Sequence, residues 1–279
     1  MLVRIGRKRN TILPKTFQHY FRGKLMVTKK TTARYAAEQV QDDEQKTRHQ
    51  PAVSNSLKIK PDHLKTFEPL TENQRLFFEM YKGGAYFMGL FGSPGVGKTF
   101  LALYKALEEV LDKSNSFKQV VVVRSLVQLR DVGYLPGDLN EKQEIYELPY
   151  KEIAATLFGR TDAWDRLKEQ NHVRFISTTA IRGISIDDAI IIVDENQNLN
   201  WSEVNTIITR VGHRSKIIFS GDFKQTDLIK SNKDQTAFHS FLEVARKMPS
   251  FQEIYFTPDD IVRSSLVKQW IVACEQLGY

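Results

Sequence analysis

The sequence predicts an α/β protein with a mostly parallel central sheet. Short apolar runs rich in β-branched residues alternate with segments of helical periodicity, a pattern typical of strands joined through helices. Some of these runs, such as 120–123 and 189–193, are apolar at every position rather than at every second one, which indicates strands covered on both faces. Hydrophobic residues are 41% and charged residues 26% of the 279 residues, so the chain can build a sizeable core.

Each element is justified by its own local pattern. A first helix is expected from Thr71, a suitable N-cap, to Lys82, because Gly83 and Gly84 then stop it. Residues 100–111 have helical spacing and follow the first expected strand. The expected strands share a largely continuous apolar character: 85–91, 120–123, 173–177, 189–193, 216–220 and, as a sixth, 252–256.

Charge separates the chain into two parts. Residues 1–65 carry 15 Lys and Arg against 5 Asp and Glu, whereas residues 66–279 carry 25 against 28. The first part also lacks sustained apolar periodicity, so we expect a basic, poorly ordered or partly helical tail before a folded domain over 66–279. Such a tail is either a solvated segment without a partner or an electrostatic arm for nucleic-acid phosphates. A third alternative is that translation starts at Met26 and the first 25 residues are not translated.

Composition excludes several classes of protein. A single cysteine, Cys274, permits neither an intramolecular disulfide nor a cysteine-based zinc site, and the six histidines contain no HxxxH pair. No apolar run approaches the ~20 residues of a membrane span. The basic first 25 residues lack the apolar core of a secretory signal. We therefore expect no membrane partner and a cytoplasmic, reducing location.

The segment after the first expected strand fits the phosphate-loop pattern G-x-x-x-x-G-K-[ST] at every position. It stands between an expected strand and an expected helix, the context that this motif requires, which argues against a chance glycine-rich turn. Glycines allow backbone N–H groups to converge on phosphate oxygens, Lys98 can reach the β- and γ-phosphates, and Thr99 can ligate Mg²⁺. The predicted nucleotide-binding residues here are Gly92, Ser93, Pro94, Gly95, Val96, Gly97, Lys98, Thr99 and Phe100.

Two adjacent carboxylates follow the strand expected over 189–193. Asp194 suits the metal-binding role of a Walker B aspartate, and Glu195 is placed to orient and polarise a water molecule against the γ-phosphate. Two acidic residues at a strand end often only cap it, but together with a phosphate loop they indicate a nucleotide site. Because phosphate transfer to a small molecule needs no activated water, Glu195 favours hydrolysis over a kinase reaction.

A polar segment follows the strand expected over 216–220. Gly221, Asp222 and Gln225 resemble the G-D-x-x-Q motif of superfamily 1 helicases. This resemblance implies that the strand lies beside the phosphate-loop strand, with Gln225 facing the nucleotide. Gln74 resembles the adenine-reading glutamine of the same enzymes, and the alternative for it is a surface glutamine on a helix.

Further motifs resemble the PhoH-like family of ATPases, including members encoded by bacteriophages. In order and approximate spacing, the matching segments are 133–139, Glu141-Lys142, Pro149-Tyr150, Arg182-Gly183, 194–198, 209–212 and 260–263. The resemblance covers roughly residues 70–275 and implies a three-layer RecA-like domain, ATP and Mg²⁺ as cofactors, and a bacterial or infected-host cytoplasm. Some members add a PIN-type ribonuclease, but residues 1–65 hold no acidic cluster for one. Asn196 stands where the family usually has alanine.

Two arginines are candidates for completing the site, because superfamily 1 helicases place ATP between two lobes and this chain has no length for a second one. Arg210 is expected to end the helix after Asp194 and resembles the arginine finger of ring-forming ATPases. Arg263 stands in a segment that resembles the family's D-x-V-R. Structural salt bridges are the alternative for both. A finger that acts on the neighbouring subunit predicts a homo-oligomer, and the family resemblance implies a six-membered ring.

These features predict an ATP hydrolase whose cycle is coupled to nucleic acid, with RNA ahead of single-stranded DNA and helicase-like remodelling. One alternative is a nucleotide-gated binding or ring-assembly module with slow hydrolysis.

Aromatic residues after the second expected strand can stack on bases or, by default, pack in the core: Tyr134, Tyr146, Tyr150 and Phe158. The predicted catalytic residues are Lys98, Glu195, Gln225, Arg210 and Arg263.

Overall fold

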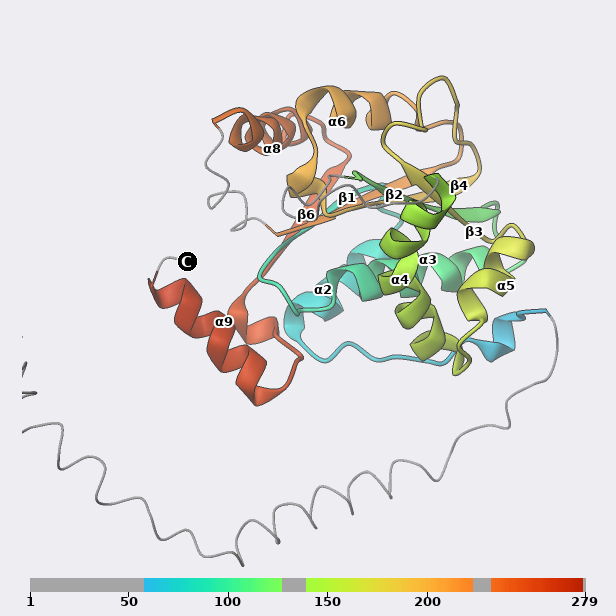
Figure 1. Ribbon diagram of the computed structural model, residues 1–279, viewed down its shortest axis with the longest axis horizontal. Coiled ribbons are helices and arrows are strands. Elements are labelled where there is room, and N and C mark those ends of the chain that lie inside the picture. The colour runs from blue at the N-terminus through green and yellow to red at the C-terminus, as the bar shows by residue number, and fades with distance from the viewer. Residues whose placement is uncertain (1–57, 127–138, 223–231, 278–279) are drawn as a thin grey trace, which may run out of the picture. The chain divides into compact units, whose positions relative to one another are not determined.

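A six-stranded parallel sheet with helices on both faces organises the computed structural model, which describes residues 58–126, 139–222 and 232–277 (Figure 1). The strands are β1 (Phe87–Gly92), β2 (Gln119–Arg124), β3 (Val173–Ser177), β4 (Ala189–Asp194), β5 (Lys216–Gly221) and β6 (Phe251–Phe256), in the spatial order β3-β2-β4-β5-β1-β6. All neighbours are parallel, so the six carboxyl ends lie along one edge. The predicted α/β class is confirmed.

The helices complete three layers. One face of the sheet is covered by α2 (Glu72–Lys82), α3 (Lys98–Leu111), α4 (Leu139–Phe158) and α5 (Ala163–Glu169). The other face is covered by α6 (Trp201–Ile208) and α8 (Asn232–Ala245) (Figure 1). Helix α9 (Ser265–Leu277) follows β6 and the short helix η5 (Pro258–Asp260).

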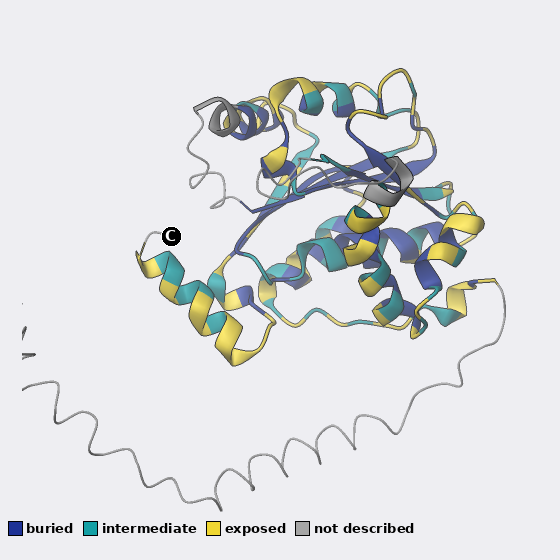
Figure 2. Ribbon diagram, in the orientation of Figure 1, coloured by how far each residue is buried: buried dark blue, intermediate teal, exposed yellow. Residues whose placement is uncertain are grey.

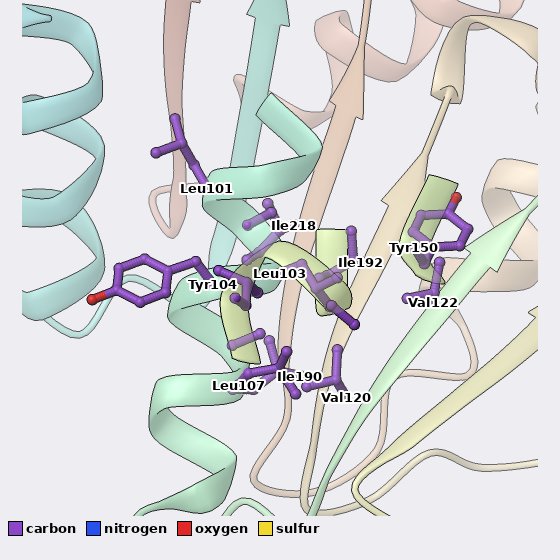
Figure 3. Close-up of a cluster of buried hydrophobic side chains, with 14 of the residues drawn as sticks. Leu101, Leu103, Tyr104, Leu107, Val120, Val122, Tyr150, Ile190, Ile192 and Ile218 are labelled. Atoms are coloured by element: carbon purple, nitrogen blue, oxygen red, sulfur yellow. The ribbon is translucent and has the colours of Figure 1, made fainter. Parts of the chain in front are cut away.

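The central strands are buried on both faces because two apolar clusters cover them (Figure 2). Successive side chains of a strand point to opposite faces. Val120 and Val122 of β2 therefore join the cluster under α3, which Figure 3 shows, while Val121 and Val123 join the cluster under α6 and α8. This double burial explains why β2 is apolar at four consecutive positions.

The predicted elements are present, with boundaries shifted by at most two residues. Thr71 caps α2 as predicted, because its hydroxyl accepts a hydrogen bond from Gln74 N–H at 3.4 Å. Helix α3 begins at Lys98, earlier than expected, since Gly97 turns the loop directly into the helix with φ 88°. Helix α6 ends at Ile208, so Arg210 lies in the turn after the helix and does not end it.

Residues 58–65 pack against the folded domain, although their charge had assigned them to the basic tail. Ile59 is buried in the cluster under α3, and the Lys65 N–H donates a hydrogen bond to the Leu157 carbonyl at 2.9 Å. A single apolar residue in a basic stretch is too weak a pattern to reveal this packing. The rest of the expected tail, residues 1–57, lies outside the described residues. No helix within the described ranges is both long and apolar enough to cross a membrane.

Candidate active site

The phosphate loop follows β1 and opens α3, as the motif requires. Gly92 has φ 118°, and a Cβ there would lie 2.0 Å from the Phe256 carbonyl oxygen, so only glycine fits where β1 runs beside β6. Gly95 and Gly97 also have positive φ angles of 77° and 88°. The sequence therefore places glycine where the loop backbone must curl around a phosphate group.

Lys98 lies folded against its own loop. Its ammonium group donates hydrogen bonds to the carbonyl oxygens of Gly92 and Ser93, both at 2.8 Å. Burial lowers the pKa of Lys98, although nearby carboxylates raise it; they belong to Asp222, Glu195 and Asp194. Lys98 and these three carboxylates lie together at the carboxyl ends of the neighbouring strands β1, β5 and β4.

A hydroxyl and a carboxylate suited to Mg²⁺ meet beside the loop. The Thr99 hydroxyl donates to Asp194 Oδ1 at 2.8 Å, across 95 positions of sequence. Both groups offer hard oxygen ligands, which Mg²⁺ prefers, so the donor set fits this ion. No group of three or more His, Cys, Asp and Glu residues within the described ranges could hold a metal alone. The ion therefore needs phosphate oxygens and water as further ligands.

Glu195 is held in place by a residue that sequence reasoning overlooked. The Gln197 amide donates to Glu195 Oε2 at 2.6 Å, and Gln197 Oε1 accepts from the Asp222 N–H at 3.1 Å. Gln197 is only 1% exposed. It therefore joins the segment after β4 to the segment after β5. Its position in the run Asp194–Asn198 was the only sequence signal.

Asp194 has a second hydroxyl partner on α4. The Tyr150 hydroxyl donates to Asp194 Oδ2 at 2.8 Å. Burial and the charge of Asp194 raise the pKa of Tyr150 well above its usual 10. Burial alone would lower the pKa of nearby Arg124. Tyr150, Asp194 and Glu195 have the opposite and larger effect, so the pKa of this arginine is raised.

Gln74 is a buried residue, not a surface glutamine. Its side chain is 4% exposed, accepts a hydrogen bond from Leu70 N–H at 2.8 Å and donates one to the Val96 carbonyl at 3.0 Å. The amide thus ties the segment before α2 to the phosphate loop. Its adenine-reading role stays a prediction.

The two candidate arginines lie at opposite edges of the sheet. Arg263 lines the nucleotide pocket, and its Cγ lies 3.0 Å from the position that a Cβ on Gly95 would take. The Arg210 carbonyl accepts a hydrogen bond from the Ile186 N–H, three residues before β4 begins. Arg210 therefore lies at the edge of the sheet formed by the amino ends of the strands. Its Nε is buried without a hydrogen-bond partner among the described residues.

Gln225 lies outside the described residues, but β5 does lie beside β1 as the helicase resemblance implied.

A cavity of about 660 Å³ extends from the phosphate loop along α3. Lys98, Thr99, Asp194 and Glu195 line its polar end. Its other wall is largely apolar and is formed by Phe67, Phe78, Phe100, Pro149 and Ile153. A volume of this size, with few polar groups at one end, suits a nucleotide-sized ligand.

The central sheet lies between two layers of helices, and the phosphate loop follows β1. Asp194 ends β4, and β5 lies between β4 and the phosphate-loop strand β1. These features define a P-loop NTPase of the RecA-like type. The chain belongs to the PhoH-like family, because the family model described as PhoH-like protein matches residues 66–275.

Curated relatives agree with this assignment. A PhoH-like protein of Bacillus subtilis (strain 168) is 32% identical over 213 residues, which are 76% of this chain and 65% of that protein. Protein PhoH2 of the same organism is 36% identical over 182 residues, 63% of this chain and 40% of that protein. The chain thus spans between 40% and 65% of these two relatives. Among solved structures, the Sulfolobus solfataricus SWI2/SNF2 ATPase core in complex with dsDNA is similar at a TM-score of 0.41 and 13% identity, over 71% of this chain and 46% of that chain.

Proposed function

We propose that this chain binds ATP with Mg²⁺ and hydrolyses it, and that RNA or single-stranded DNA is coupled to the cycle. The observation that carries the proposal is the contact between Thr99 and Asp194. It brings the phosphate loop and the strand-end carboxylate together, beside Lys98 and Glu195. A bound nucleotide would therefore meet phosphate-binding, metal-binding and water-activating groups at one end of the cavity.

Each residue has a separable role in this proposal. The loop N–H groups and Lys98 bind the phosphates, and Thr99 and Asp194 hold Mg²⁺. When bound, the ion neutralises negative charge on the phosphate oxygens. Glu195 orients a water molecule and accepts its proton while the water oxygen attacks the γ-phosphorus, so that ADP and inorganic phosphate leave.

The central test separates binding from turnover. We expect Glu195→Gln to retain ATP binding and to lose turnover by about 10²-fold or more, because it removes the general base but no metal ligand. Lys98→Ala should instead weaken ATP binding. Calorimetric binding and phosphate release measure the two effects. Glu108→Gln, on the exposed side of α3, is the matched control and should behave as the parent. Parent-like turnover by Glu195→Gln would contradict the assigned role.

Coupling to nucleic acid rests on the charge of residues 1–65, where cations exceed anions by ten. Phosphate release measured with and without poly-RNA or single-stranded DNA tests this coupling. Strong stimulation by one polymer supports a coupled motor. Slow hydrolysis that no polymer stimulates favours the second candidate, a nucleotide-gated binding or assembly module.

We further propose a homo-oligomer in which Arg210 enters the neighbouring subunit's site. Arg210 lies at the opposite edge of the sheet from its own phosphate loop, so it is suited to act on a neighbour and not on its own nucleotide. Arg263 lines its own subunit's pocket and is better placed to act there. Positive charge that reaches the γ-phosphate stabilises the charge developing in the transition state.

A further inference from the structure

Tyr150 makes a polar contact that the sequence motifs do not predict and that has no role in the proposed mechanism. Its side chain is fully buried, and its ring stacks on Trp164 with centroids 5.7 Å apart and packs beside Phe175 at 5.8 Å. Figure 3 shows the hydroxyl pointing away from the labelled apolar side chains. That hydroxyl donates to Asp194 Oδ2 at 2.8 Å. Core packing explains the ring but not the aim of the hydroxyl.

Asp194 is held by two hydroxyl groups from different elements. Thr99, at the start of α3, donates to Oδ1, and Tyr150, on α4, donates to Oδ2. A carboxylate bonded at only one oxygen can still rotate about its terminal torsion, whereas donors at both oxygens define the plane of the group. Asp194 is 3% exposed, so bulk water cannot easily replace either donor.

We propose that Tyr150 is a positioning residue that orients the metal-ligating carboxylate of Asp194. This inference rests on the proposed Mg²⁺–nucleotide site. Partners that orient a metal ligand typically change metal affinity about 10–100-fold when they are removed. Tyr150 should therefore control how strongly Mg²⁺ and nucleotide reinforce each other's binding, without touching the nucleotide itself.

The experiment measures binding, so it needs no turnover. The dissociation constant of the non-hydrolysable analogue AMP-PNP is measured by calorimetry in EDTA and in saturating MgCl₂. The value in EDTA divided by the value in MgCl₂ reports the coupling between metal and nucleotide. We expect Tyr150→Phe to lower this ratio about 10-fold and to leave the value in EDTA within about twofold. Thermal unfolding checks that the variant is folded. Tyr150→Met is the second variant, because methionine fills irregular space without a hydroxyl donor.

Tyr81→Phe is a matched control within the same apolar cluster. Tyr81 is also a buried tyrosine that donates to a carboxylate, Glu109, at 2.6 Å, but it does not line the nucleotide cavity. Its ratio should stay within about twofold of the parent. In an Asp194→Asn background, Tyr150→Phe should cause no further loss, because the tyrosine acts through Asp194.

The outcomes distinguish this inference from the proposed function. If the parent responds to Mg²⁺ and a folded variant without the Tyr150 hydroxyl responds equally, the positioning role is overturned while the nucleotide site stands. An additional loss in the Asp194→Asn background also overturns it. If the parent binds AMP-PNP equally with and without Mg²⁺, the proposed metal site fails, and the role of Tyr150 fails with it.

Discussion

Single residues at the carboxyl end of β4 have unusual conformations and contacts. Glu195 has φ 52° and ψ 44°, a left-handed conformation that costs a non-glycine residue roughly 1–2 kcal/mol. Gln197 holds this residue through the hydrogen bond to its carboxylate. Between them, Asn196 is 3% exposed, and its Oδ1 has no hydrogen-bond partner among the described residues. The local cost coincides with the residue that we assign to water activation, as is common at functional sites.

The contact between Asn196 and Gly221 gives a prediction at this scale. A Cβ on Gly221 would lie 1.7 Å from Asn196 Oδ1, so Gly221→Ala should lower the free energy of unfolding by about 1–3 kcal/mol. Asn196→Ala alone should cost less than about 1 kcal/mol, because it removes a buried acceptor that lacks a partner.

Denaturant unfolding measures both effects, and the double variant should recover part of the loss caused by Gly221→Ala. Recovery is only partial because Gln197 Oε1 would also lie 2.7 Å from the new Cβ. Additive losses in the double variant would mean that Asn196 does not limit the space at Gly221.

Whole elements are joined to the phosphate loop by a few polar contacts. Gln74 connects α2 to Val96, and the Ser93 hydroxyl donates to Glu275 of α9 at 2.8 Å. The Asn73 amide donates to Asp260 Oδ2 at 2.7 Å, which joins α2 to η5. The loop is therefore held by α2 from the amino-terminal side of the domain and by α9 from the carboxyl-terminal side.

Gln74→Ala tests the contribution of α2. We expect a loss of about 1–3 kcal/mol in unfolding free energy, because the Val96 carbonyl loses a buried donor. Nucleotide affinity should fall as well. Gln269→Ala, an exposed glutamine on α9, is the control and should stay within about 0.5 kcal/mol of the parent.

The nucleotide specificity of the folded Gln74→Ala variant then decides its second role. An equal loss of affinity for ATP and GTP limits Gln74 to holding the loop. A selective loss for ATP adds the predicted reading of adenine. Unchanged stability would contradict the structural contribution of its two hydrogen bonds.

At the scale of the whole molecule, the nucleotide site and Arg210 lie at opposite edges of one sheet. A mixing experiment follows from this separation. Subunits with Arg210→Ala keep an intact site without the finger, and subunits with Lys98→Ala keep the finger beside a defective site. Mixed together, they should recover phosphate release that neither has alone, because each supplies the part that the other lacks.

Two controls accompany the mixing experiment. Lys98→Ala mixed with Glu195→Gln should recover nothing, since both lack a working site. Arg214→Ala should retain activity, because Arg214 lies in the same connection as Arg210 but pairs with Asp188. A monomer in light scattering, with activity independent of protein concentration, would exclude the proposed assembly.

The sequence alone determined the elements and the identity of the chemical groups. The sequence located all six strands within two residues. Burial on both faces leaves a continuous apolar pattern in β1, β2 and β4, whereas β6 is partly exposed and carries Gln252 and Glu253. The spacing of Gly92, Gly97 and Lys98 predicted the loop, since its conformation depends on glycine at particular positions. By contrast, the net charge of residues 1–65 wrongly placed Ile59 in the basic tail. A single buried side chain leaves no periodic pattern that would correct this assignment.

Only the tertiary structure decided which groups meet. Periodicity shows which residues form strands, but the neighbours of each strand follow from the packing of the whole sheet. The order β4-β5-β1 brings Asp222 close enough to bond Gln197, and the packing of α4 on the sheet brings Tyr150 to Asp194. These partners are separated by 25 and 44 positions along the chain. No local preference records contacts at such separations, because they depend on how elements pack and not on the conformation of either segment.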